Sequence, residues 1–148
     1  NMVTAVGRLH PDMIIHLGDC WADAEQLHRK FPMTVMEQVP GNCDCRQEVQ
    51  ERILLIEGKK ILICHGHTFN VKAGYLNLEY AAEERKVDAA LFGHTHRVFY
   101  DKHNRIAYMN PGSIGQPPYG IPPSYGILQV DGSSNTIATD VIYLEENN

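Results

Sequence analysis

The sequence has no long apolar run. Its apolar segments, such as Ile61-Leu62-Ile63-Cys64, are far shorter than the roughly 18–20 residues that a membrane-spanning helix needs. The first ten residues also lack the charged flank and the apolar stretch of a signal peptide. We therefore expect a cytoplasmic protein that does not associate with a membrane.

An excess of positive charge is also absent. The chain has 13 basic and 18 acidic residues, for a net charge of −5. Proteins that bind nucleic acid neutralise phosphates with clustered Lys and Arg, so this composition does not favour a nucleic-acid partner. A mild negative charge is explained by solubility alone. The 148 residues, 43% of them hydrophobic, predict one packed domain spanning 1–148.

Cysteine is sparse and its spacing is not that of a disulfide framework. Cys20, Cys43, Cys45 and Cys64 form neither such a framework nor a pair of C-x-x-C zinc motifs. We therefore expect reduced thiols, as in a cytosolic protein. An alternative is a structural zinc site built on Cys43, Cys45 and nearby histidines, in which case Cys43→Ser would unfold the protein.

Strand-like apolar segments alternate with helical patterns along the chain, which is typical of an α/β fold. Helices are predicted over 3–9, 22–31 and 76–86, and strands over 12–17, 34–39 and 87–92. Hairpins are predicted over 52–64, 98–109 and 126–143, with the last turning around Asp131-Gly132.

Four of the predicted strands end in polar residues next to glycine. These ends are Gly18-Asp19, Gly41-Asn42, His65-Gly66-His67 and Gly93-His94-Thr95-His96. Each alone has an ordinary explanation as a helix cap, a turn or a packing histidine. Because sites in α/β sheets gather at the carboxyl ends of strands, the whole set indicates one shared site.

The side chains at these strand ends are of metal-ligating types. Asp19 offers a carboxylate, Asn42 a carbonyl oxygen, and His65, His94 and His96 offer imidazole nitrogens. Mixed nitrogen and oxygen ligation favours manganese, iron, zinc, cobalt or nickel over calcium. The sequence therefore predicts a site for a divalent transition metal.

The order of these motifs, closed by Asn110-Pro111-Gly112-Ser113, resembles the calcineurin-like metallophosphoesterases. It looks most like their small bacterial and archaeal phosphodiesterase branch, and the resemblance covers about residues 12–143. The resemblance implies a β-sandwich of two mixed sheets flanked by helices. It also implies a metal-dependent hydrolase, with manganese expected, that cleaves a small phosphodiester by means of a hydroxide bridging two metals.

The same resemblance assigns roles to the ligands. Asp19 would bridge two metals, Asn42, His65 and His94 would complete one site, and His96 would ligate the other metal. The family's Asp-x-His motif, which supplies the rest of the second site, is absent. We therefore expect an N-terminally truncated domain with its first strand missing, one firmly bound metal and low activity. The exposed sheet edges would favour a homo-dimer or higher homo-oligomer.

Substrate contacts are less sharply implied. Cys43 stands where larger members of the superfamily carry a histidine thought to assist the leaving group, so Cys43 and His67 are the candidate catalytic residues. Asn42, Gly66 and His67 are the candidate phosphate contacts, and His67 has an equal interpretation as a packing residue.

The main alternative keeps the fold and drops catalysis, as in the protein-binding retromer scaffold subunit. Such scaffolds tend to lose a metal-site histidine. This chain retains both His94 and His96, which favours an enzyme.

Overall fold

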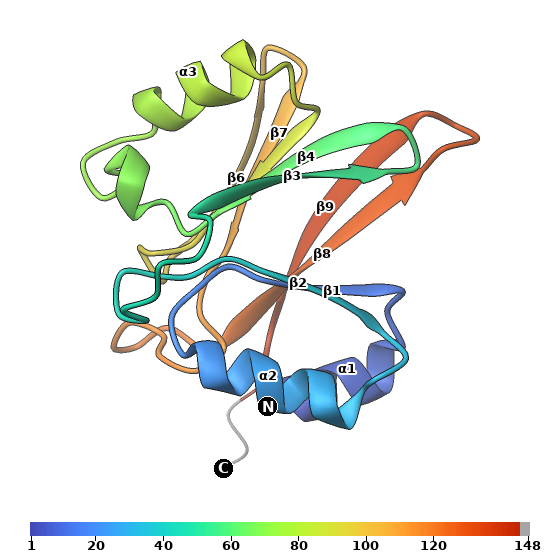
Figure 1. Cartoon of the computed structure of the whole chain (residues 1–148), viewed down its shortest axis with the longest axis vertical. Coiled ribbons are helices and arrows are strands. Elements are labelled where there is room, and N and C mark those ends of the chain that lie inside the picture. Colours follow the sequence, from blue (N-terminus) through green and yellow to red (C-terminus); the bar gives the residue numbers. More distant parts are fainter. Residues whose placement is uncertain (146–148) are drawn as a thin grey trace.

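The computed structural model describes residues 1–145. Its elements are α1 (Met2–Leu9), β1 (Met13–His16), α2 (Trp21–Lys30), β2 (Val35–Gln38), β3 (Glu51–Ile56), β4 (Lys59–Cys64), the short 3-10 helix η1 (His67–Phe69), α3 (Leu76–Glu84), β5 (Ala89–Leu91), β6 (Val98–His103), β7 (Ile106–Pro111), β8 (Ser124–Asp131) and β9 (Thr136–Tyr143) (Figure 1).

The largest layer is a five-stranded mixed sheet with the order β3-β4-β5-β7-β6. Its central strands β4, β5 and β7 are parallel, and β3 and β6 are joined to it as antiparallel hairpins. Both hairpins turn on two residues with left-handed backbone, Glu57-Gly58 at φ 49° and 80°, and Asn104-Arg105 at φ 49° and 65°. Such two-residue turns match the twist of the flanking strands, which explains why these hairpins were predictable.

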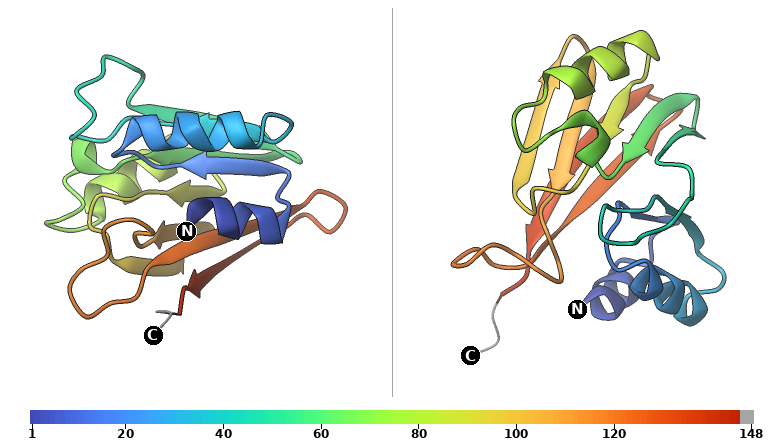
Figure 2. Two further views of the ribbon diagram at one scale, coloured as in Figure 1. Left: turned by 90° about the horizontal axis from the view of Figure 1, so that it is seen from below. Right: turned by 60° about the vertical axis from the view of Figure 1, so that its left-hand side comes forward.

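Two apolar cores lie on opposite faces of this sheet. On one face, α3 and η1 pack over a cluster that includes Leu62, Leu78 and Phe92. On the other face, β1, β2, β8 and β9 pack over a cluster that includes Ile61 and Leu91. Strands β4 and β5 are therefore covered on both sides (Figure 2), which explains their nearly continuous apolar sequences.

The second layer consists of two strand pairs. β1 and β2 are parallel, whereas β8 and β9 are antiparallel, and within residues 1–145 the two pairs are not hydrogen-bonded into one sheet. Helices α1 and α2 lie on the side of β1 and β2 that faces away from the large sheet (Figures 1 and 2). The predicted α/β class with helices flanking a layered sheet is confirmed.

Some predicted boundaries are wrong for local reasons. The third hairpin turns around Gly132 as predicted but over residues 132–135, because Asp131 still pairs with Thr136 and its carboxylate accepts hydrogen bonds from the N–H groups of Ser133 and Ser134. Strand β5 covers only Ala89–Leu91, and the chain bends after Gly93, at His94 and Thr95. Helix α3 ends at Glu84, before Lys86 at φ 53°, and η1 was not predicted.

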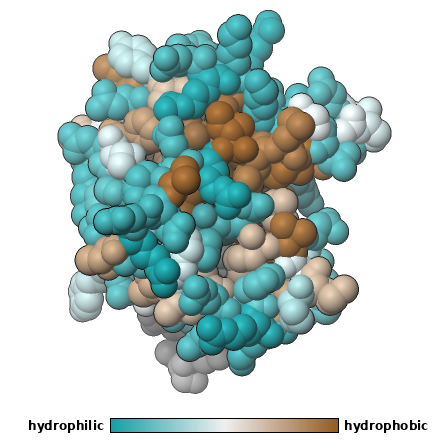
Figure 3. Space-filling model, viewed as in Figure 1, coloured by the Kyte–Doolittle hydropathy of each residue, from teal (hydrophilic) through white to brown (hydrophobic). Residues whose placement is uncertain are grey.

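One face of the β3–β4 hairpin stays uncovered. The side chains of Ile53 and Leu55 are 47% and 73% exposed, and apolar side chains gather over this hairpin in the space-filling view (Figure 3). Among the helices formed by residues 1–145, we find none with the length and apolar character needed to cross a bilayer.

Candidate metal centre

The five predicted ligands lie at one edge of the molecule, at the ends of strands from both layers. Asp19 and Asn42 follow β1 and β2, while His65 follows β4. His94 and His96 follow β5. The parallel strands within each layer end on the same side, and that is why four loops far apart in the sequence meet there.

His65 is the hub of this arrangement and is only 2% exposed. Its Nε2 atom lies 3.0 Å from Asn42 Oδ1 and 3.2 Å from His94 Nδ1. The same Nε2 lies 3.5 Å from Asp19 Oδ2. Three of the other predicted ligands therefore surround one ring nitrogen.

The protonation of the His65 ring follows from its other nitrogen. Nδ1 lies 2.7 Å from the carbonyl oxygen of Leu17, and a carbonyl can only accept, so Nδ1–H donates. Burial lowers the pKa of His65 despite the raising effects of Leu17 and Asp19, which favours the neutral ring. Nε2 then carries a lone pair directed at the oxygens of Asn42 and Asp19. Lone pairs that face one another without a proton between them suit a bound cation.

His96 is oriented in the same way from another loop. Its Nδ1 lies 2.9 Å from the carbonyl oxygen of Gln116 and must also donate. Its Nε2 then lies 3.7 Å from Asp19 Oδ2, the same oxygen that His65 faces. A histidine whose second nitrogen is fixed by a backbone carbonyl is the usual arrangement of a metal-ligating imidazole.

Asp19 divides its two oxygens between two tasks. Oδ1 accepts a hydrogen bond of 3.2 Å from the N–H of Cys43, while Oδ2 faces the two histidines. Burial alone raises the pKa of Asp19, but His65 and the Cys43 hydrogen bonds outweigh it, so the pKa lies below its ordinary value. The carboxylate is thus ionised and held in place.

The glycines at the strand ends are required by this close packing. A Cβ atom on Gly18, which has φ 103°, would lie 2.6 Å from the Gly41 nitrogen and 2.7 Å from His65 Nδ1. A Cβ atom on Gly41 would overlap the Asp19 carboxylate. Only glycine lets the two loops approach closely enough for Asp19 and Asn42 to meet.

Two further side chains, whose roles the sequence did not reveal, hold the ligand loops together. The Asp44 carboxylate accepts hydrogen bonds from the N–H groups of Trp21, at 2.8 Å, and Gly41, at 2.7 Å. The bond to Gly41 runs back to the N–H three residues earlier, unlike the forward bond of an Asx turn, and so it had no clear local signal. Sequence alone could not show that the same carboxylate also reaches the start of α2.

Asn110 holds the other ligand loop. It is fully buried, and its Nδ2 donates to the Gly93 carbonyl oxygen at 2.8 Å and to Thr95 Oγ1 at 2.9 Å. Its Oδ1 accepts from the Gly112 N–H at 3.0 Å. These bonds hold the loop in which His94 and His96 have left-handed backbone, at φ 68° and 57°. Such backbone is uncommon outside glycine and needs this kind of support.

The two candidate catalytic residues lie beside the ligands. The His67 ring centroid is 5.3 Å from that of His65, and within residues 1–145 its buried Nδ1 has no hydrogen-bond partner. Cys43 is exposed, and the Asp19 carboxylate raises the pKa of its thiol. Cys45 is also exposed, and this argues against a structural zinc core built on Cys43 and Cys45.

The donor set fits a divalent metal by its chemistry. Two ligands about 2.1 Å from one ion at tetrahedral or square angles lie about 3.0–3.4 Å apart. The separations around His65 Nε2, 3.0 to 3.5 Å, are close to that range. Among residues 1–145, no three His, Cys, Asp or Glu side chains are grouped around one point as they stand. Small side-chain shifts would therefore have to accompany metal binding.

Comparisons with known proteins identify the family of the chain. Residues 1–133 match the family described as the calcineurin-like phosphoesterase superfamily domain. The chain is 36% identical over 128 residues to the "probable metallophosphoesterase YsnB" of Bacillus subtilis, covering 85% of this chain and 73% of that protein. It is 30% identical over 114 residues to the phosphodiesterase YfcE of Escherichia coli, covering 77% of this chain but only half of YfcE.

Solved structures share the fold. A predicted phosphoesterase from Streptococcus pneumoniae superposes with a TM-score of 0.79 at 25% identity, covering 95% of this chain and 80% of that one. A Vps29 single mutant from Entamoeba histolytica gives a TM-score of 0.71 at 20% identity, covering 96% and 89%. The second likeness shows the fold alone. With the family match spanning most of its length, the chain belongs to the calcineurin-like phosphoesterase superfamily.

Proposed function

We propose that this chain is a metal-dependent phosphodiesterase in which the five clustered side chains hold the cation. One observation carries the proposal: His65 and His96, each fixed through Nδ1 to a backbone carbonyl, both turn Nε2 toward Asp19 Oδ2. The name of YfcE supports the choice of a phosphodiester over other phosphate esters.

The chemistry that a divalent cation supplies when bound is activation of a water molecule and neutralisation of charge on the phosphoryl oxygens. We assign Asn42, His65 and His94, together with one oxygen of Asp19, to the firmer metal position. His96 and Asp19 serve the second position, which has fewer ligands from this chain and is weaker. Manganese is the metal that we expect, with nickel, iron, cobalt and zinc as alternatives of similar ligand preference.

We assign the phosphate contacts to Asn42, Gly66 and His67. The unpartnered His67 Nδ1 needs a hydrogen-bond partner, and a phosphoryl oxygen would accept from it if Nδ1 carries the proton. The Cys43 thiol stays protonated because Asp19 raises its pKa, so it has a proton to give to a leaving alcohol. We place the activity in the cytoplasm, where free thiols stay reduced. We also expect a homo-oligomer, and sedimentation would measure its size.

Hydrolysis of bis-p-nitrophenyl phosphate with added manganese tests the proposal. Asp19→Asn and His65→Gln should each lower kcat/KM by about 100-fold or more, because each removes a donor at the hub of the site. His103→Gln, an exposed histidine on β6, is the matched control and should keep wild-type activity. Unchanged activity in Asp19→Asn and His65→Gln would overturn the assignment.

The fold shared with Vps29 supports a second candidate, a non-catalytic scaffold of the same architecture. The retention of His94 and His96 favours the enzyme. The same preparation separates the two: a chain that binds manganese in calorimetry but hydrolyses neither bis-p-nitrophenyl phosphate nor another phosphodiester would be a scaffold.

A further inference from the structure

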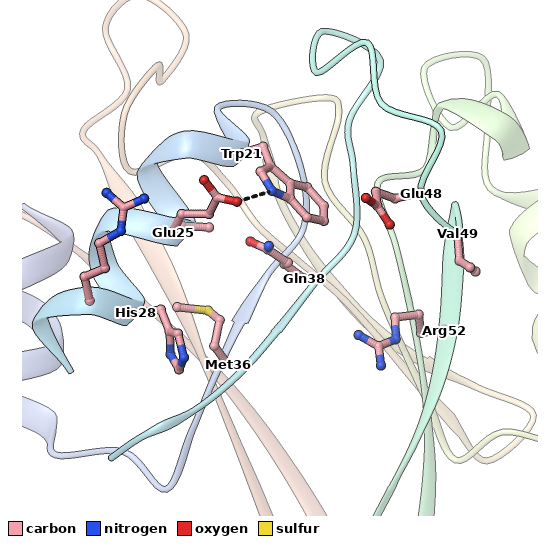
Figure 4. A pocket seen from close by; sticks show the side chains of 10 residues that line it. Trp21, Glu25, His28, Met36, Gln38, Glu48, Val49 and Arg52 are labelled. Carbon is pink, nitrogen blue, oxygen red and sulfur yellow. Dashed lines mark hydrogen bonds between the residues drawn. The ribbon is translucent and has the colours of Figure 1, made fainter. Parts of the chain in front are cut away.

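A cavity of about 630 Å³ lies between helix α2, strand β2 and the segment that leads into β3 (Figure 4). This volume is in the range that small-molecule sites occupy. None of the five proposed metal ligands lines the cavity, so it is separate from the metal centre. The features that decide what it binds are Trp21, Gln38, Glu25 and Glu48.

Trp21 forms a flat, fixed wall of this cavity. Its Nε1–H donates to Glu25 Oε1 at 3.0 Å, a bond that restrains the rotation of the indole (Figure 4). The Arg46 guanidinium lies over the ring, 5.0 Å from its centroid, and does not line the cavity, so a ligand in the cavity would meet the other face of the indole. The indole therefore offers a pre-arranged aromatic surface to a planar ligand at little entropic cost.

Gln38 lines the cavity and carries an unused acceptor. Its Oε1 atom is buried and, within the part of the chain that the structure describes, has no hydrogen-bond partner. A buried carbonyl oxygen without a donor is unfavourable, so a small turn of the amide toward the cavity, where a ligand brings an N–H group, would be stabilised. The carboxylates of Glu25 and Glu48 lie on opposite sides of the cavity (Figure 4) and add acceptors, and Arg29 and Arg52, which also line it, balance their charge.

The cavity begins next to the metal centre. Trp21 follows Asp19 by two residues, which places their Cα atoms within about 7 Å of each other. The Asp44 carboxylate ties the Trp21 N–H to the Gly41 N–H, and so joins the cavity wall to the loop that carries Asn42. A substrate with its phosphate at the metal centre could therefore extend a neighbouring group toward Trp21.

We propose that this cavity takes the base of a nucleoside phosphodiester. The heterocycle stacks on Trp21, and an N–H group of the base donates to Gln38 Oε1. Each base offers both an aromatic face and an N–H donor, which an alkyl chain or a sugar alone does not combine. The link to catalysis rests on the proposed phosphodiesterase function, whereas base binding by the cavity does not.

Tryptophan fluorescence tests base binding directly, because Trp21 is the only tryptophan in the chain. Adenosine added to the metal-free protein should change the emission saturably, and ribose should not. Gln38→Leu should weaken adenosine binding about tenfold, the effect of one lost hydrogen bond. Gln26→Leu is the matched control, since Gln26 is exposed on α2 and does not line the cavity.

A saturable adenosine response in wild type, weakened by Gln38→Leu and not by Gln26→Leu, supports the proposal. Absence of a saturable response in wild type overturns it without reference to any variant. Equal weakening by both variants overturns the assignment to Gln38.

A second measurement separates this proposal from the catalytic one. With manganese present, wild type should prefer the p-nitrophenyl ester of thymidine 5′-phosphate to bis-p-nitrophenyl phosphate in kcat/KM, and Trp21→Leu should remove the preference while keeping the smaller substrate's rate. If both substrates are cleaved with no preference, the base-site proposal is contradicted and the phosphodiesterase proposal is retained. If adenosine binds but neither substrate is cleaved, the phosphodiesterase proposal is contradicted and the base-site proposal is retained.

Discussion

At the scale of single residues, ring orientation decides what the candidate site can do. His65 and His96 each give one nitrogen to a backbone carbonyl, from Leu17 and Gln116, and thereby present the other as a lone pair. The residue types were visible in the sequence. The carbonyl partners were not, because any residue carries a carbonyl and only the path of the chain brings one within reach.

The depressed histidine pKa values predict acid sensitivity. Burial, followed by the influence of His65 and Lys72, lowers the pKa of His94 from 6.5 to about 4, and burial also lowers that of His65. Between these values the unfolded chain binds protons that the folded chain does not, so the free energy of unfolding falls as the pH drops from 6.5 toward about 4. Urea unfolding in EDTA at pH 7 and at about pH 5 measures the difference.

Replacing His94 tests how much of this pH-dependent loss of stability comes from the His94 ring. His94→Gln should show a smaller loss of stability between the two pH values than wild type. His103→Gln should keep the wild-type difference. An undiminished difference in His94→Gln would contradict the assignment.

At the scale of elements, the edge strand β3 shows how one strand serves two environments. Its side chains alternate, so that Leu54 enters the core between the layers at 8% exposed while Leu55 stays 73% exposed. This alternation is the normal consequence of strand geometry. The sequence Ile53-Leu54-Leu55-Ile56 is apolar throughout, and so composition alone could not say which leucine is buried.

The two adjacent leucines form a matched pair for a stability test. Leu54→Ala should lower the free energy of unfolding by roughly 2–4 kcal/mol through lost burial and the cavity left behind. Leu55→Ala should change it by about 0.5 kcal/mol or less, because its side chain is largely in solvent. Urea denaturation of both variants checks this, and equal losses would show that the strand register is wrong.

At the scale of the whole molecule, the candidate metal centre joins the two layers. Asp19 and Asn42 follow strands of the smaller layer, and His65 and His94 follow strands of the five-stranded sheet. A metal bound by all four would therefore link the layers and stabilise the folded chain over the unfolded one.

Thermal unfolding measures how much a bound metal stabilises the folded chain. Manganese at about 100 times its dissociation constant should stabilise the fold by about 2.7 kcal/mol. For a chain of this size that corresponds to a rise in Tm of about 5–10 °C. EDTA should reverse the rise, and His65→Gln should remove most of it while His103→Gln keeps it. If manganese does not change the Tm of wild type, the chain has no tight manganese site.

The sequence by itself determined the α/β class and most of the elements, and it predicted the residues of the candidate metal centre. It could do so because strand-ending glycines next to Asp, Asn and His are local signals, and the apolar periods of strands and helices are local as well. The division of the second layer into two strand pairs, the loop-holding roles of Asp44 and Asn110, and the cavity beside Trp21 were decided only by the tertiary structure. Each depends on segments that are distant along the chain and adjacent in space, and no local pattern records which of these segments will meet.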